Sequence, residues 1–176
     1  MKNFLLSIAI FSLFSFKSFG HVEHYENFKY LEYELFRNNK SIGYHKYDFQ
    51  RNGDKLSVVS EVSFNISKLG IELYSYFAKS EENYENGLFK SYSSKTKQNK
   101  KNRYVKIKVN PSNEELIIDG SSYKGKANKN FIVGTWWNHE IIKSKAQISG
   151  ISGRIIEQTV TFIGKEKIKI GNKVYN

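Results

Sequence analysis

The sequence predicts an all-β protein: a curved or partly closed antiparallel meander sheet with one short helical connection. Three observations predict this fold. Apolar residues recur at every second position from Phe28 onward, which is typical of strands with one buried face. Turn signals such as Asn52-Gly53 and Asn86-Gly87 separate these segments at short intervals. The 176 residues suffice for one globular core, and the short segments with polar turns favour a meander over alternating strands and helices.

The first half of the chain reads as consecutive hairpins. Leu31, Tyr33 and Leu35 share one face of the first predicted strand, and Asn38 to Lys40 follow as a turn. In the second strand, His45 shares a face with Tyr47 and Phe49, where we expect it to be half-buried. A polar connection is expected over Lys97 to Asn102. The further strands predicted in this half are Ile42–Gln50, Leu56–Ile66, Ile71–Lys79, Leu88–Thr96 and Tyr104–Val109.

The second half is predicted to contain shorter strands and one helical stretch. Trp137, Ile141 and Ile142 show helical spacing between Gly134 and Ile148, which indicates one or two turns of helix. After Val174 the alternation stops without a return strand, so we expect the chain to be truncated or its sheet edge to be completed by something else. The strands predicted here are Glu115–Ile118 with Ser121–Lys124 as its partner, Arg154–Ile163, and a last segment with Ile168, Ile170 and Val174 on one face.

Residues 1–20 are typical of a secretory signal peptide. A lysine at Lys2 precedes an apolar and serine stretch from Phe4 to Phe16, which is shorter than a membrane span, and small residues follow at Ser18 and Gly20. An uncleaved anchor or a buried helix is the alternative. We expect cleavage after Gly20, export to the periplasm or the medium, a single β domain over residues 21–176, and no membrane span in the mature chain.

Most catalytic and cofactor-binding motifs are absent from the sequence. The chain has no cysteine, which excludes disulfides, thiolate metal sites and a cysteine nucleophile. Ser149 to Gly153 has the wrong spacing for the G-x-S-x-G nucleophile motif, and no H-E-x-x-H, P-loop or dinucleotide-binding motif occurs. We therefore assign no catalytic residue, metal or cofactor.

The densest candidate site is the segment that breaks the strand pattern. Trp136, Trp137, Asn138 and His139 lie next to Glu140 there and are our candidate ligand-binding residues. The alternatives are that the tryptophans plug one end of the sheet, or that His139 and Glu140 act as general acid and base. Adjacent residues point apart on a strand or helix, which argues against the catalytic alternative.

A second candidate site is the basic stretch from Lys95 to Lys108. Such a stretch can bind lipid phosphates or anionic envelope polymers. The alternatives are a solvated hairpin tip and a codon bias, since the chain has 24 lysines but four arginines. Export and the scarcity of arginine both argue against a nucleic-acid partner. The candidates for binding an anionic surface are Lys95, Lys97, Lys100, Lys101 and Arg103.

Several segments together carry a resemblance: Lys40–His45, Tyr74–Tyr76, Ser80–Leu88, Ser93–Thr96 and Trp137-Asn138 before the segment that contains Gly153. In these segments the chain resembles a family of uncharacterised secreted bacterial proteins, which are similar to curved antiparallel β-sheet envelope proteins. The resemblance covers Phe28 to Val174 and implies a fold and a compartment but no catalytic residue. It also implies further strands after Tyr175.

The leading hypothesis for function is a non-enzymatic secreted or periplasmic module that binds an apolar or amphipathic envelope ligand. Inward aromatic side chains of the first five strands would form the wall of the site, and the segment with Trp136 and Trp137 would close one end. One alternative is a hydrolase-type enzyme that uses His139 and Glu140. The other is a structural module that associates with the cell envelope through an unfinished sheet edge.

Overall fold

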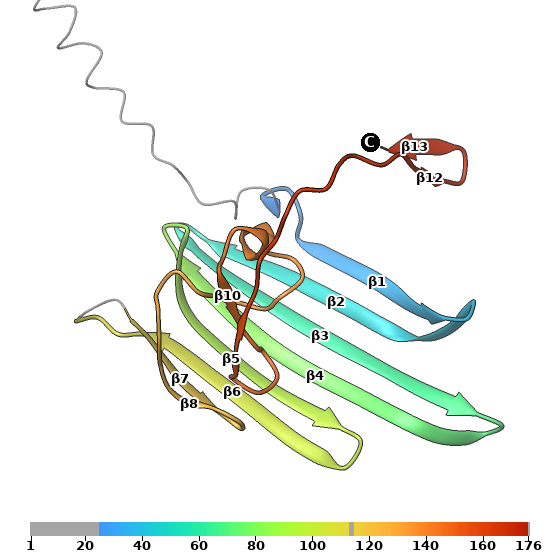
Figure 1. Cartoon of the computed structure of the whole chain (residues 1–176), viewed down its shortest axis with the longest axis horizontal. Helices are drawn as coiled ribbons and strands as arrows, with labels where there is room; N and C mark the ends of the chain where they lie inside the picture. The colour runs from blue at the N-terminus through green and yellow to red at the C-terminus, as the bar shows by residue number, and fades with distance from the viewer. Residues whose placement is uncertain (1–24, 113–114, 176) are drawn as a thin grey trace, which may run out of the picture.

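The computed structural model describes residues 25–112 and 115–175, so the predicted signal peptide lies outside the described residues. The main element is an eight-stranded antiparallel meander in which each strand pairs with the next one in sequence (Figure 1). The predicted all-β meander is therefore confirmed. Its strands are β1 (Tyr30–Arg37), β2 (Lys40–Asn52), β3 (Lys55–Lys68), β4 (Ile71–Glu85), β5 (Leu88–Gln98), β6 (Lys101–Val109), β7 (Leu116–Gly120) and β8 (Lys124–Ala127).

Tight turns set the length of the strands. Asn86 and Gly87 both have positive φ angles, as the predicted Asn-Gly hairpin requires. In the first hairpin only Gly53 has a positive φ, because Asn52 ends β2 and pairs with Lys55. Asn99 also has a positive φ, of 52°, so β5 and β6 are joined by a tight turn at Asn99-Lys100. The predicted polar connection over 97–102 is correspondingly shorter, because its outer residues continue the ladder between β5 and β6.

One face of the sheet, which we call the inner face, carries the core. Side chains from neighbouring strands lie opposite each other on it and form rows across the sheet. One such row consists of Phe49, Val58, Glu82, Tyr92, Ile107 and Ile118. A second row, nearer the other end of the strands, consists of Tyr33, His45, Val62, Ala78, Thr96 and Arg103.

Residues 128–158 fold over part of the inner face, and we call them the cover. The cover contains the three-stranded sheet of β9 (Ile132–Val133), β10 (Ala146–Ile148) and β11 (Ile155–Glu157), in the order β11-β10-β9. Val133 and Ile148 pack against Val105, Ile107 and Ile118 in one buried cluster. In Figure 1 the cover (orange) crosses the sheet over its middle strands.

The cover differs from the sequence prediction in two places. The helical stretch expected over residues 134–148 is only the single 3-10 turn η2 (His139–Ile142), capped by Asn138, whose side chain accepts a hydrogen bond from the Glu140 amide. It stops there because residues 146–148 pair as β10 with the neighbouring strands. The strand expected over 154–163 is only β11, since β10 offers it three residues of pairing.

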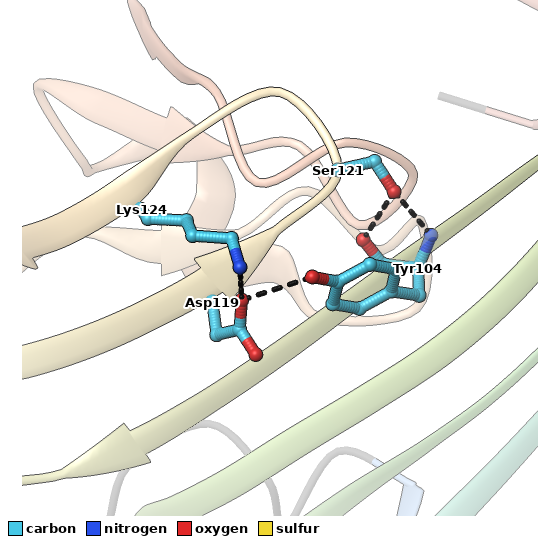
Figure 2. A network of polar contacts seen from close by, with 4 residues as sticks. All are labelled: Tyr104, Asp119, Ser121 and Lys124. Carbon is cyan, nitrogen blue, oxygen red and sulfur yellow. Dashed lines mark hydrogen bonds and ion pairs between the residues drawn. The ribbon is translucent and has the colours of Figure 1, made fainter.

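The strands at the far edge of the sheet are also shifted from their predicted positions. The partner of β7 is β8, so residues 121–123 form the turn rather than a strand. Figure 2 shows what holds this turn. The Ser121 hydroxyl accepts from the Tyr104 amide at 2.6 Å and donates to its carbonyl at 3.0 Å. The Asp119 carboxylate pairs with the Lys124 ammonium at 3.0 Å and accepts from the Tyr104 hydroxyl at 3.1 Å, and these two groups hold its pKa below the usual value.

An exposed arm follows the cover. It ends in a two-stranded hairpin of β12 (Ile168–Ile170) and β13 (Lys173–Tyr175), whose six residues are all exposed. Phe162 and Ile163 in the preceding segment are exposed as well. The arm therefore adds nothing to the buried clusters described above.

Candidate ligand-binding site

The cover closes one half of the inner face around Trp137. Its indole is 3% exposed and lies edge-on to Phe49 and Tyr84, with ring centroids 5.8 Å away in both cases. Tyr92 and Ser94 of β5 donate to the carbonyl of Gly150 in the cover. This half of the inner face is a packed core.

A buried carboxylate fixes Trp137 to the sheet. Glu82 accepts hydrogen bonds from Trp137 Nε1 at 2.9 Å and from the Thr135 hydroxyl at 3.2 Å, both in the cover, and from the Tyr84 hydroxyl at 2.5 Å. Burial raises the pKa of Glu82, and these three donors offset part of that rise because they favour the charged form. Burial and the adjacent Glu82 raise the pKa of Tyr84 well above its usual value.

The structure separates the four residues of the candidate ligand-binding segment. Trp137 and Asn138 are buried, and the Asn138 amide donates to the Tyr84 hydroxyl at 3.2 Å. Trp136 is 86% exposed. His139 is exposed and lies 3.0 Å from the Tyr25 hydroxyl through Nε2. The four side chains therefore do not line one common surface.

His139 and Glu140 also point to different partners. The His139 ring stacks on Tyr25 at 5.7 Å between centroids, whereas the Glu140 carboxylate pairs with Lys143 at 3.0 Å. The two side chains are thus held by different groups, His139 by Tyr25 of the N-terminal segment and Glu140 by Lys143 at the end of the turn.

Strand alternation distributes the basic stretch over two faces. Lys95 and Lys97 are exposed on the outer face of β5, and Lys100 lies in the turn. Lys101 and Arg103 stand opposite Gln98 and Thr96 and belong to the inner face. The five candidate residues are thus close in sequence but do not form one patch on one face.

The other half of the inner face remains open. Apart from the buried Thr96, its side chains are half-buried or exposed although their positions continue the rows of the core. Phe64 stacks on Tyr76 and Tyr74 at 5.1 and 5.8 Å between ring centroids. We call this surface the open inner face. It includes Tyr33, His45, Val62, Phe64, Tyr74 and Tyr76.

Polar groups of defined geometry border the open inner face. His45 is half-buried as predicted, lies 2.9 Å from the Ser60 hydroxyl, and has its pKa lowered by burial. Arg103 closes the row on the β6 side; its guanidinium donates to the Ser122 hydroxyl at 3.3 Å, and its buried Nε has no hydrogen-bond partner in the described part of the chain. The surface thus combines an aromatic centre with a cation at its margin.

Sequence reasoning found the inward aromatics of β1 to β5 but not the boundary between the covered and open halves. That boundary depends on where residues 128–158 cross the sheet, and no local pattern in the sequence specifies this contact. Alternation in β3 and β4 does place Phe64, Tyr74 and Tyr76 on one face, so their shared orientation could have been derived.

The described residues contain no group of three or more histidine and carboxylate side chains arranged to hold a metal ion. Within that same part of the chain, no helix has the length and apolar character needed to cross a bilayer.

A family model described as a domain of unknown function (DUF6134) matches residues 33–176. The match includes nearly all of the meander and the whole cover. The search of curated proteins and the search of solved structures gave no match.

Proposed function

The chain belongs to this DUF6134 family, and we propose that it is an exported, non-enzymatic protein of the bacterial envelope that binds an amphipathic ligand on the open inner face. The apolar part of the ligand would lie against Phe64, Tyr74 and Tyr76. Its anionic end would lie near Arg103.

The observation that carries this proposal is the aromatic group on the open inner face. Phe64, Tyr74 and Tyr76 occupy positions equivalent to core residues, but the cover does not reach them. Concave or partly covered apolar surfaces with a few polar groups are typical of ligand sites. Contiguous exposed apolar surface on a protein is also commonly functional.

Arg103 supports an anionic end for the ligand. None of the ion pairs within the described residues includes it. A guanidinium with a buried, unsatisfied Nε gains from an acceptor that can reach it, and carboxylate and phosphate match its geometry.

Export is supported by the sequence of residues 1–20, with its lysine, its apolar stretch of limited length and its small residues before the expected cleavage position. An amphipathic ligand suits that location, because lipids and their fragments are abundant in the cell envelope.

Binding of a fluorescent fatty acid tests the proposal. Phe64→Ser removes an aromatic ring from the open inner face, and we expect affinity to fall about tenfold. Phe77→Ser is the matched control, because Phe77 lies beside Tyr76 on the outer face of β4. Arg103→Gln should weaken binding of the fatty acid but leave binding of its uncharged methyl ester unchanged.

Melting curves of each variant check that the fold is retained. Equal affinity of the parent and Phe64→Ser, or an equal loss in Phe77→Ser, would contradict binding at the open inner face.

A further inference from the structure

The two ends of the meander differ in charge. The turns between β1 and β2, β3 and β4, and β5 and β6 lie at one end, which we call the tip end (Figure 1, lower right). Residues 36–41, 66–73 and 97–102 at this end carry one carboxylate, Glu72, and six cations. These cations are Arg37, Lys40, Lys68, Lys97, Lys100 and Lys101.

The cations of the tip end form no ion pair with any described residue. At the opposite end the positive and negative charges of the described turn residues balance. There Lys55 and Lys90 lie 3.9 and 3.3 Å from the Glu85 carboxylate. The tip end therefore has an excess of five positive charges over six cations and one carboxylate, and such an excess attracts an anionic surface.

Large apolar side chains project from the same end. Leu69, Ile71 and Leu73 are 92%, 66% and 58% exposed. Leu69 also has a φ of 53° at the apex of the β3–β4 turn, a conformation that glycine and asparagine adopt at lower cost than leucine. Neither folding nor solubility favours an exposed leucine in this conformation, so a role outside the fold is indicated.

The apolar and basic turns are held together. The Asn99 amide donates to the Ser75 carbonyl, and the Asn99 side chain accepts from the Ser75 amide, both at 2.8 Å. These bonds connect the β5–β6 turn to β4. Leu73, Lys97, Lys100 and Lys101 line one surface hollow of about 790 Å³.

We propose that the tip end docks on an anionic lipid bilayer, with Leu69, Ile71 and Leu73 in the headgroup region and the surrounding lysines against lipid phosphates. Apolar insertion and attraction to anionic lipids act together in such interfacial binding. This inference does not depend on the ligand site. If both hold, the open inner face lies next to the membrane surface, because Ile66 and Tyr74 on that face adjoin the docking turn.

A fluorophore at position 69 tests insertion directly. The chain has no cysteine, so Leu69→Cys can be labelled at a single site with an environment-sensitive dye. With vesicles of phosphatidylcholine and phosphatidylglycerol we expect a blue shift of its emission. Leu88→Cys, at an exposed leucine near the opposite end, is the matched control and should show none.

Sedimentation with the same vesicles measures the two contributions separately. Leu69→Asn should lower partitioning about fivefold while the melting temperature is kept or raised, since asparagine tolerates the positive φ. Replacing Lys97, Lys100 and Lys101 by Gln should lower partitioning onto the vesicles about a hundredfold, because each lysine near an anionic surface contributes about a factor of five. Lys106, Lys108 and Lys145 replaced by Gln form the charge-matched control.

Three results would overturn the proposal: no blue shift at position 69, equal shifts at 69 and 88, or equal losses in the two triple variants. Binding that persists on pure phosphatidylcholine would likewise contradict an anionic bilayer as the partner. Fatty-acid binding is measured without vesicles, so failure here leaves the proposed ligand site standing.

Discussion

Trp137 connects the cover to the sheet in two ways, through apolar packing and through one hydrogen bond. We expect Trp137→Ala to lower the free energy of unfolding by about 3–5 kcal/mol, because it removes a large buried side chain. Trp137→Phe should lower the free energy of unfolding by less, and mainly because Glu82 loses the hydrogen bond that the indole donates. Urea denaturation followed by circular dichroism measures both.

Trp136→Ala is the matched control for this prediction, since Trp136 is exposed. Its unfolding curve should match that of the parent. A Trp137→Ala variant as stable as the Trp136→Ala variant would show that the cover does not depend on this side chain.

Glu82 predicts a specific dependence of stability on pH. Burial raises its pKa above the ordinary value of 4.5, so the folded state binds the proton more tightly than the unfolded state. The resulting stabilisation is fully present below about pH 4.5 and is lost as the pH rises through the folded pKa. Glu82→Gln, which does not titrate, should gain stability relative to the parent over that range.

Urea denaturation of both proteins at a series of pH values provides the measurement. The difference between their free energies of unfolding isolates the effect of Glu82 from that of Asp119. The pKa of Asp119 is lowered, so its contribution to stability changes with pH in the opposite direction. If the free energy of unfolding of the parent increased relative to that of Glu82→Gln as the pH rises, the environment described for this carboxyl would be contradicted.

At the scale of elements, sequence alone predicted the strands that alternate and the turns that need positive φ. Asn52-Gly53 and Asn86-Gly87 were found because their turn chemistry is local. β4 continues six residues past its predicted end because β3 and β5 both pair with it there, although Glu81, Glu82 and Asn83 favour strands poorly. The cover could not be placed, since its short strands depend on contacts with distant residues.

The arm after β11 predicts a pattern of proteolysis. Its hairpin is exposed on all six residues and contacts neither buried cluster. Exposed segments with few contacts are cut first. Brief digestion with trypsin should therefore cleave at Lys165, Lys167 or Lys169 and leave the meander and the cover as one fragment, which mass spectrometry of the intact products would detect.

Lysines on paired strands, such as Lys46 in β2, serve as the internal comparison. Early cleavage at those positions would mean that the meander opens more readily than the arm, against the distribution of contacts described above.

At the scale of the whole molecule, the inner face is divided into a closed half and an open half, and the open half adjoins the tip end. The candidate site could be predicted only in part. Inward aromatics followed from strand alternation, whereas the burial of Trp137 and the exposure of Trp136 depend on how the cover packs. Arg103 was identified through its charge, but its inner-face position required the register of β5 and β6.

Export makes a prediction for the whole chain. Protein recovered from a periplasmic extract or the culture medium should begin at or near His21, as cleavage after Gly20 requires. Mass spectrometry of the intact protein gives that terminus. Intact Met1 in a cytosolic fraction would contradict export.

Photo-crosslinking of a fatty acid that carries a diazirine on its chain tests the central claim most directly. The probe is activated on the folded protein, and the modified residues are located by peptide mass spectrometry. Binding at the open inner face predicts crosslinks to Phe64, Tyr74 or Tyr76, and their loss when unlabelled fatty acid competes. Crosslinks confined to the outer face around Phe77, or to the exposed Trp136, would contradict the account.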